Sequence, residues 1–191
     1  MPKTIYNSEG EEYIAEFLKR YNIKYEHQKR IEGLKNDGSK YRTADFYLPS
    51  MGVYIEYCGQ YFIPMHQERY KEKQKIYREN NIPCVYLFPE NLGVLEFIFD
   101  KRLIVELKKF HHTKQLRAYR IKKMSPEYDR LVLILFILLA QLASFYDDDF
   151  KHSKVIPLIT GLVIVYQIWK LIQVYYRIFH LDSYPLGYKN T

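Results

Sequence analysis

Hydrophobic and polar positions follow two different periods along the first 110 residues. From Ser8 to Tyr21, apolar residues recur every three or four positions behind a capping-box pair, Ser8 and Glu11, which predicts an amphipathic helix. Further helices are predicted at 65–80 and 92–110, and short strands at 24–31 and 84–88. The order of these elements predicts an α/β fold in which helices flank a mixed sheet.

Two further strands are predicted at residues 44–49 and 53–59, joined by a tight turn, and each carries one acid. Alternation along the second strand places Glu56 and Cys58 on the same face. A buried carboxylate without a partner costs several kcal/mol, and two carboxylates on adjacent strands repel each other unless a cation lies between them. Asp45 and Glu56 are therefore candidate ligands of Mg²⁺, which prefers hard oxygen donors.

The order and spacing of these motifs resemble the PD-(D/E)XK nuclease superfamily, in the branch of very-short-patch repair endonucleases and helicase-associated nuclease-like domains. The resemblance covers about residues 8–90. The motifs that carry it are Ser-Glu-Gly-Glu at 8–11, Ala-Asp-Phe-Tyr-Leu-Pro at 44–49, Ile-Glu-Tyr-Cys-Gly at 55–59 and the lysine-rich segment 70–77. It implies a restriction-endonuclease-like domain at 1–110 that hydrolyses DNA phosphodiester bonds with Mg²⁺ or Mn²⁺.

The resemblance also assigns roles to residues outside the two strands. Glu11 matches the family's helical acid and is expected to assist in metal binding, although the capping box alone would account for it. Cys58 stands where the superfamily has a catalytic lysine, and a thiol does not replace an ammonium group. Lys73, on the following helix, is the candidate replacement, although it also lies on a charged helix face that water would solvate. Gln60, just after Gly59, is a lesser candidate for contacting the water or the phosphate.

Composition narrows the class of protein. The chain has 191 residues, 48% of them hydrophobic, and a formal net charge of +7, which excludes a disordered protein. Two cysteines make no disulfide framework and indicate a reducing compartment. Because of Cys58, the alternative to a nuclease is a catalytically degenerate nuclease fold that binds nucleic acid or proteins at a membrane; a third reading is a small membrane scaffold.

The pattern changes after residue 110. A basic connector is predicted at 111–130, followed by an uncharged run at 131–145, a polar tip at 147–154 and a second apolar run that continues to residue 176. These runs predict a transmembrane helical hairpin within 131–179, with helices at about 130–146 and 155–176, and a tail at 180–191.

Basic residues before the first run and after the second place the N-terminal domain and the C-terminus in the cytoplasm, because cytoplasmic loops carry the excess of Lys and Arg. The alternative is a helical hairpin buried in a soluble homo-oligomer. The basic connector has two uses: it contacts anionic lipid headgroups, or it guides a nucleic-acid backbone to the site. The expected partners are therefore DNA and the lipid bilayer.

Overall fold

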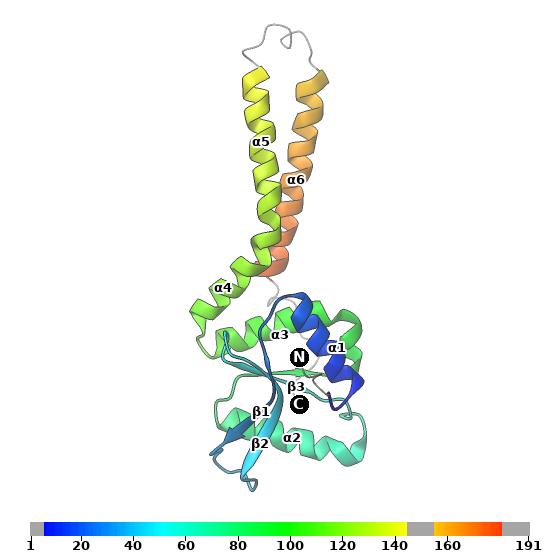
Figure 1. Ribbon diagram of the computed structural model, residues 1–191, viewed down its shortest axis with the longest axis vertical. Coiled ribbons are helices and arrows are strands. Elements are labelled where there is room, and N and C mark those ends of the chain that lie inside the picture. Colours follow the sequence, from blue (N-terminus) through cyan, green and yellow to red (C-terminus); the bar gives the residue numbers. More distant parts are fainter. Residues whose placement is uncertain (1–5, 145–154, 181–191) are drawn as a thin grey trace, which may run out of the picture. The chain divides into compact units, whose positions relative to one another are not determined.

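The computed structural model describes residues 6–144 and 155–180. The chain divides into two compact units between Leu116 and Arg117, inside the segment expected to be a basic connector. The first unit carries all the motifs of the candidate site (Figure 1).

A four-stranded mixed sheet forms the centre of the first unit. Its strands are β1 (Glu26–Glu32), β2 (Tyr41–Leu48), β3 (Val53–Tyr57) and β4 (Cys84–Leu87), arranged in the order β1-β2-β3-β4. The first three strands are antiparallel, and β4 runs parallel to β3. The predicted mixed α/β fold is confirmed at this level.

Helices cover both faces of the sheet: α2 (Pro64–Glu79) lies on one side, and α1 (Glu9–Arg20) and α3 (Leu95–Lys109) lie on the other (Figure 1). The segment 92–110, predicted as one helix, instead begins as a 3₁₀-helix, η1 (Pro89–Val94). The reason is local: Pro89 fixes its own φ, and the Asn91 side chain accepts the Phe88 N–H at 3.0 Å.

The core of this unit packs α1 and α3 against the apolar face of the sheet. Phe46 and Ile55 are fully buried on paired positions of β2 and β3. Phe17 of α1 meets Phe99 of α3 edge to face, with ring centroids 5.2 Å apart. This core holds the strands and α1 in fixed relation, so that the polar groups at their ends have defined positions.

Of the two hydrogen bonds that the predicted capping box of α1 would contain, the structure has one. The Ser8 hydroxyl accepts the Glu11 N–H at 3.2 Å. The Glu11 carboxylate accepts instead the N–H of Asn7, at 3.3 Å. In a capping box, Glu11 would accept the N–H of Ser8; here it accepts the N–H of the residue before Ser8. The Glu11 carboxylate also contacts His27 of the sheet.

The second unit is helical where it is described. After α4 (Thr113–Met124), which includes the boundary residues, a 3₁₀ turn, η2 (Ser125–Glu127), leads into α5 (Tyr128–Ser144), and α6 (Val155–Phe179) lies beside α5 (Figure 1). The predicted polar tip and most of the predicted tail, at 145–154 and 181–191, lie outside the described residues.

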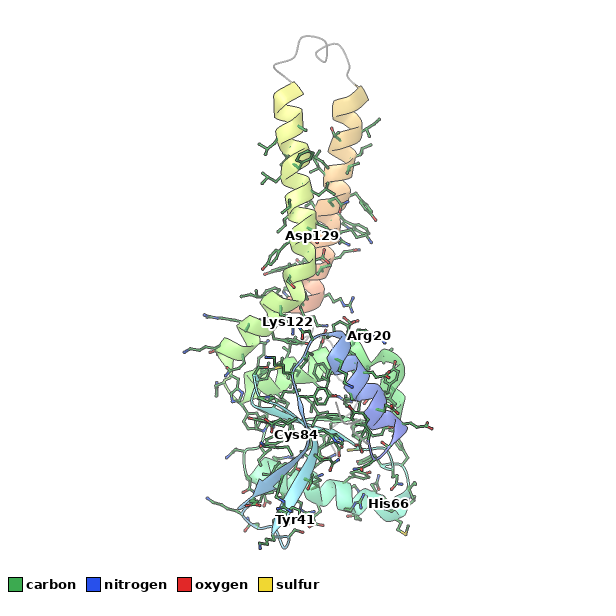
Figure 2. The ribbon with its side chains drawn as sticks, viewed as in Figure 1. Arg20, Tyr41, His66, Cys84, Lys122 and Asp129 are labelled. Atoms are coloured by element: carbon green, nitrogen blue, oxygen red, sulfur yellow. The ribbon has the colours of Figure 1, made fainter. Side chains whose placement is uncertain are left out.

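Large apolar side chains project outward along both of these helices (Figure 2). The most exposed belong to Phe136, Leu162, Val132 and Val165. Across residues 6–144 and 155–180, no helix combines the length and the apolar character that crossing a membrane requires. The transmembrane assignment stays a prediction.

Candidate functional site

Asp45 and Glu56 lie beside each other at the point where β2 and β3 separate. The ladder pairs Phe46 with Ile55, so the next position in the same register sets Asp45 opposite Glu56. Pairing ends there, and the Asp45 Oδ2 atom accepts the N–H of Tyr57 at 2.6 Å. The two acids that the sequence placed on neighbouring strands are thus brought together by strand register.

Lys73 reaches this acid pair from α2. Its Nζ atom lies 2.7 Å from the Glu56 Oε2 atom and donates a second hydrogen bond, at 2.8 Å, to the carbonyl oxygen of Thr43 on β2. The lysine therefore bridges two strands at the point where β3 continues into Cys58. Its charge also acts on Asp45, where it lowers the pKa of the carboxyl group.

Tyr77 completes the surroundings of Glu56. Its hydroxyl donates to the Glu56 Oε1 atom at 2.9 Å, so each carboxylate oxygen of this residue, only 3% exposed, has a partner. Sequence reasoning missed Tyr77. The signal was present, since Tyr77 follows Lys73 by four residues and the two share one helix face.

Burial governs the electrostatics of the acid pair. The pKa of Glu56 is raised to about 7, mainly by desolvation, with the Lys73 charge opposing the shift and the Asp45 charge adding to it. Desolvation likewise raises the pKa of Asp45 to about 6, against the hydrogen bond from Tyr57. Both carboxyls therefore titrate close to neutral pH, where a bound cation would favour their charged forms.

Glu11 is buried and lies against a histidine that sequence reasoning missed. The His27 Nε2 atom is 3.2 Å from the Glu11 Oε2 atom, and the Glu11 carboxylate acts on Asp45 by raising its pKa. The pairing of β1 with β2 keeps one register here: His27 pairs with Phe46 and Lys29 with Ala44, so Gln28, whose φ is 54°, stands opposite Asp45. A positive φ is uncommon for a residue other than glycine, and the pattern of residues 24–31 gave no sign of it.

A groove of about 690 Å³ opens beside Glu11, between the start of α1 and the segment after β3. The Tyr57 ring forms part of its wall and is flanked by two glycines. A Cβ atom on Gly10 would lie 2.2 Å from this ring, and one on Gly59 would lie 2.8 Å from it. Gln60, the lesser sequence candidate, also lines the groove rather than contacting the acid pair.

Asp45 and Glu56 carry the type of oxygen atom that Mg²⁺ prefers, and both Glu56 oxygens already accept hydrogen bonds, from Lys73 and Tyr77. Protein-bound Mg²⁺ commonly takes one or two carboxylates and fills its other positions with water and phosphate. Asp45 and Glu56 supply hard oxygen atoms, and among the described residues the Asp45 Oδ1 atom receives no hydrogen bond. A cluster of three or more His, Cys, Asp or Glu side chains able to hold a metal is absent from the described part of the chain.

Cys58 contributes nothing to this donor set. It is buried, and burial raises the pKa of its thiol far above the ordinary value, so the thiol stays neutral. Lys73, and not a residue at the position of Cys58, supplies the positive charge beside the acid pair.

The arrangement is thus a buried carboxylate pair with one ammonium group in contact, a second carboxylate–imidazole pair nearby, and an open groove at its edge. Comparison of the chain with known protein families, with characterised proteins and with solved structures found no match.

Proposed function

We propose that the first unit is a metal-dependent nuclease that hydrolyses phosphodiester bonds of DNA. The observation that carries this proposal is the contact between Lys73 and Glu56, at 2.7 Å. A lysine from α2 occupies the position beside the acid pair that the strand residue Cys58 leaves without a charge. The restriction-endonuclease-like character of the sheet belongs to the same proposal.

In this proposal Asp45 and Glu56 would hold Mg²⁺ or Mn²⁺, with Glu11 assisting. The ion, when bound, supplies Lewis acidity and a nucleophilic water near neutral pH. Lys73 stabilises the negative charge that develops on the phosphate, because its ammonium group already faces the site. Tyr77 fixes the orientation of the Glu56 carboxylate, since its hydroxyl donates to the oxygen that Lys73 leaves open.

We further propose that the α5–α6 hairpin attaches the protein to the lipid bilayer. The support is the row of exposed apolar side chains on both helices and the adjoining basic surface of α4. The exposed basic residues there are Lys114, Arg117 and Lys122. Their charge favours anionic headgroups and places the nuclease unit and the C-terminus on the cytoplasmic side. Cleavage would then be confined to DNA near the membrane.

The test uses the full chain in detergent or nanodiscs with plasmid, linear and single-stranded DNA, and with RNA. Each is incubated with Mg²⁺, Mn²⁺ or EDTA. We expect cleavage that requires the metal and falls by about 100-fold or more in Asp45→Asn, Glu56→Gln and Lys73→Ala. Lys75→Ala is the matched control, because Lys75 lies on the same helix and its side chain is 75% exposed. Full activity in Glu56→Gln would show that the site is wrongly assigned.

A degenerate fold that binds nucleic acid without cutting it is the second candidate, and Cys58 favours it. The distinguishing measurement is the thermal midpoint with and without Mg²⁺. A ligand that binds only the folded state raises this midpoint. A rise that disappears in Asp45→Asn indicates a metal site that still works; no rise, together with nucleic-acid binding and no cleavage, indicates a binding module.

A further inference from the structure

Helix α2, which carries Lys73, has little apolar contact with the sheet. Of its 16 residues only Ile76 and Tyr77 are buried. Two adjacent buried positions make only a small apolar contact, which leaves the exact rotation of the helix about its axis and its position along that axis weakly determined. Polar contacts must therefore define where the Lys73 side chain points.

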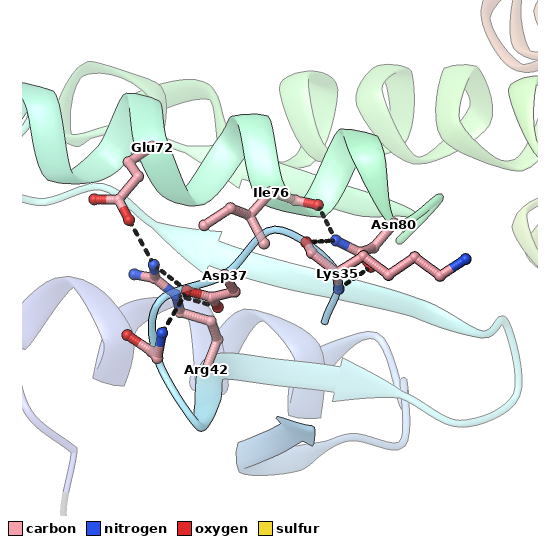
Figure 3. Close-up of polar contacts among 7 residues, drawn as sticks. Lys35, Asp37, Arg42, Glu72, Ile76 and Asn80 are labelled. Carbon is pink, nitrogen blue, oxygen red and sulfur yellow. Dashed lines mark hydrogen bonds and ion pairs between the residues drawn. The ribbon is translucent and has the colours of Figure 1, made fainter. Parts of the chain in front are cut away.

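The strongest of these polar contacts is a cluster that we name the Arg42 clamp, formed by Asp37, Arg42 and Glu72 (Figure 3). The Arg42 guanidinium donates to both oxygens of Asp37, at 2.8 and 2.7 Å. It also donates to the Glu72 Oε1 atom of α2 at 2.8 Å. The Asp37 side chain has no exposed surface and that of Arg42 is 14% exposed, so water screens this pair only weakly, whereas the Glu72 side chain is 57% exposed and its contact with Arg42 is open to water.

A second contact holds the end of α2 to the same loop. The Asn80 side chain accepts the Lys35 N–H at 2.7 Å and donates to the Lys35 carbonyl at 3.0 Å. Glu72 and Asn80 are eight residues apart, a separation of about 12 Å along a helix. Arg42 of β2 and Lys35 of the loop before it therefore contact α2 at two places, and two contacts this far apart limit both the rotation of the helix and its movement along its axis (Figure 3).

Lys73 directly follows Glu72, and one of its acceptors, the carbonyl of Thr43, directly follows Arg42. We propose that Arg42 is a positioning residue for Lys73: by holding Asp37 and Glu72 together it fixes α2 in the rotation that directs the Lys73 ammonium at Glu56. The catalytic consequence rests on the nuclease function proposed above, but the placement of the lysine does not.

Selective labelling of lysines in the full chain tests the placement directly. Trace acetic anhydride followed by peptide mass spectrometry gives the relative reactivity of each lysine. Lys75 is the internal reference on the same helix. In proportion to the exposed side-chain fractions of 19% and 75%, we expect Lys73 to react about four-fold more slowly than Lys75 in the wild type.

Substitutions that remove the Arg42 clamp should abolish the slow acetylation of Lys73. In Arg42→Met and in Glu72→Ala we expect Lys73 to react as fast as Lys75, with partial protection restored in Arg42→Lys. Lys71→Met is the matched control, because it removes only the exposed ion pair with Glu68 on the same helix. Glu72→Ala places a good helix former at an exposed position, so this variant is expected to fold. It therefore tests whether the clamp positions Lys73 even if Arg42→Met fails to fold. Wild-type protection of Lys73 in folded Glu72→Ala would overturn the proposal.

Cleavage kinetics form the second arm of the experiment. If the wild type cleaves DNA, Glu72→Ala should lower kcat while leaving KM unchanged, because the misplaced lysine acts in the transition state. A lower kcat in Lys71→Met as well would point to a general loss of helix stability and overturn the positioning role. If the wild type does not cleave, the nuclease proposal fails, and the labelling result still decides whether the clamp places Lys73.

Discussion

At the scale of single residues, the candidate site depends on carboxyl groups held away from water. Glu56 is almost fully buried, and its two oxygens receive hydrogen bonds from Lys73 and Tyr77. Burial disfavours the charged form, and one ammonium group does not restore the ordinary pKa. The folded protein therefore binds protons at Asp45 and Glu56 that the unfolded chain releases at lower pH.

This predicts a fall in stability as pH rises. Between the ordinary carboxyl range near pH 4 and the raised pKa of about 7, the folded state holds more protons than the unfolded state, so the free energy of unfolding decreases with pH. The slope from Glu56 is at most about 1.4 kcal/mol per pH unit. Urea unfolding from pH 4 to 8 should show a shallower fall in Glu56→Gln than in the wild type.

The control for this measurement is Glu68→Gln, because Glu68 is an exposed acid on α2. It should keep the wild-type slope. If Glu56→Gln showed the same slope as the wild type, the raised pKa of Glu56 would be wrong.

A second residue-scale prediction concerns Gly10. Its Cα lies so close to the Tyr57 ring that an added Cβ would fall 2.2 Å from it. We expect Gly10→Ala to displace the ring, narrow the groove and destabilise the protein by about 1–3 kcal/mol. Chemical denaturation checks the stability, and tyrosine fluorescence reports a change around the ring. Gly93→Ala, where nothing lies within 4 Å, should change stability by less than about 0.5 kcal/mol.

At the scale of elements, α2 is a charged helix held to the sheet by a small apolar patch and a polar loop. Ile76 and Tyr77 join Ile31, Ala44 and Cys84 in one buried cluster. This apolar patch holds α2 against the sheet, and the Arg42 clamp sets the orientation of α2. The separation explains how a helix so rich in Lys and Glu carries a side chain to a defined position.

The patch can be tested apart from the clamp. We expect Ile76→Ala to lower the free energy of unfolding by about 2–4 kcal/mol, because it removes buried methyl groups and leaves a cavity. Met65→Ala, at an 80% exposed position of the same helix, should cost less than about 0.5 kcal/mol. Equal losses in the two variants would mean that α2 does not pack on the sheet through Ile76.

At the scale of the whole molecule, the chain joins two units of different character. The first unit buries its apolar residues around a sheet, whereas α5 and α6 expose theirs along their length. A contiguous exposed apolar surface marks an interaction with a membrane or with another protein chain. Bilayer attachment and homo-oligomerisation are the two outcomes to separate.

Flotation with anionic lipid vesicles separates them. We expect the full chain to float with the vesicles, and the double variant Phe136→Glu, Leu162→Glu to lose most of this binding, because two charges would enter the apolar surface. Val94→Glu, an exposed position of the first unit, is the control and should float like the wild type. A detergent-free chain that forms a defined oligomer and ignores vesicles would contradict attachment and favour the oligomer.

Local rules were sufficient for much of this protein. The Ser8 cap, the strands that carry Asp45 and Glu56, and the position of α2 follow from residues close together in the chain, where turn chemistry and periodicity act. Lys73 was identified only through the family resemblance, because its charged surroundings are also those of an ordinary solvated helix face.

Tertiary structure alone decided the rest. The contact of His27 with Glu11, the Tyr77 bond to Glu56 and the link from Arg42 to Glu72 join residues 16, 21 and 30 positions apart. No periodic pattern encodes such contacts, because they depend on strand register and on the rotation of α2. The sequence by itself determined which groups were available and which strands carried the acids; packing determined which groups met, since burial and distance arise only when separate elements come together.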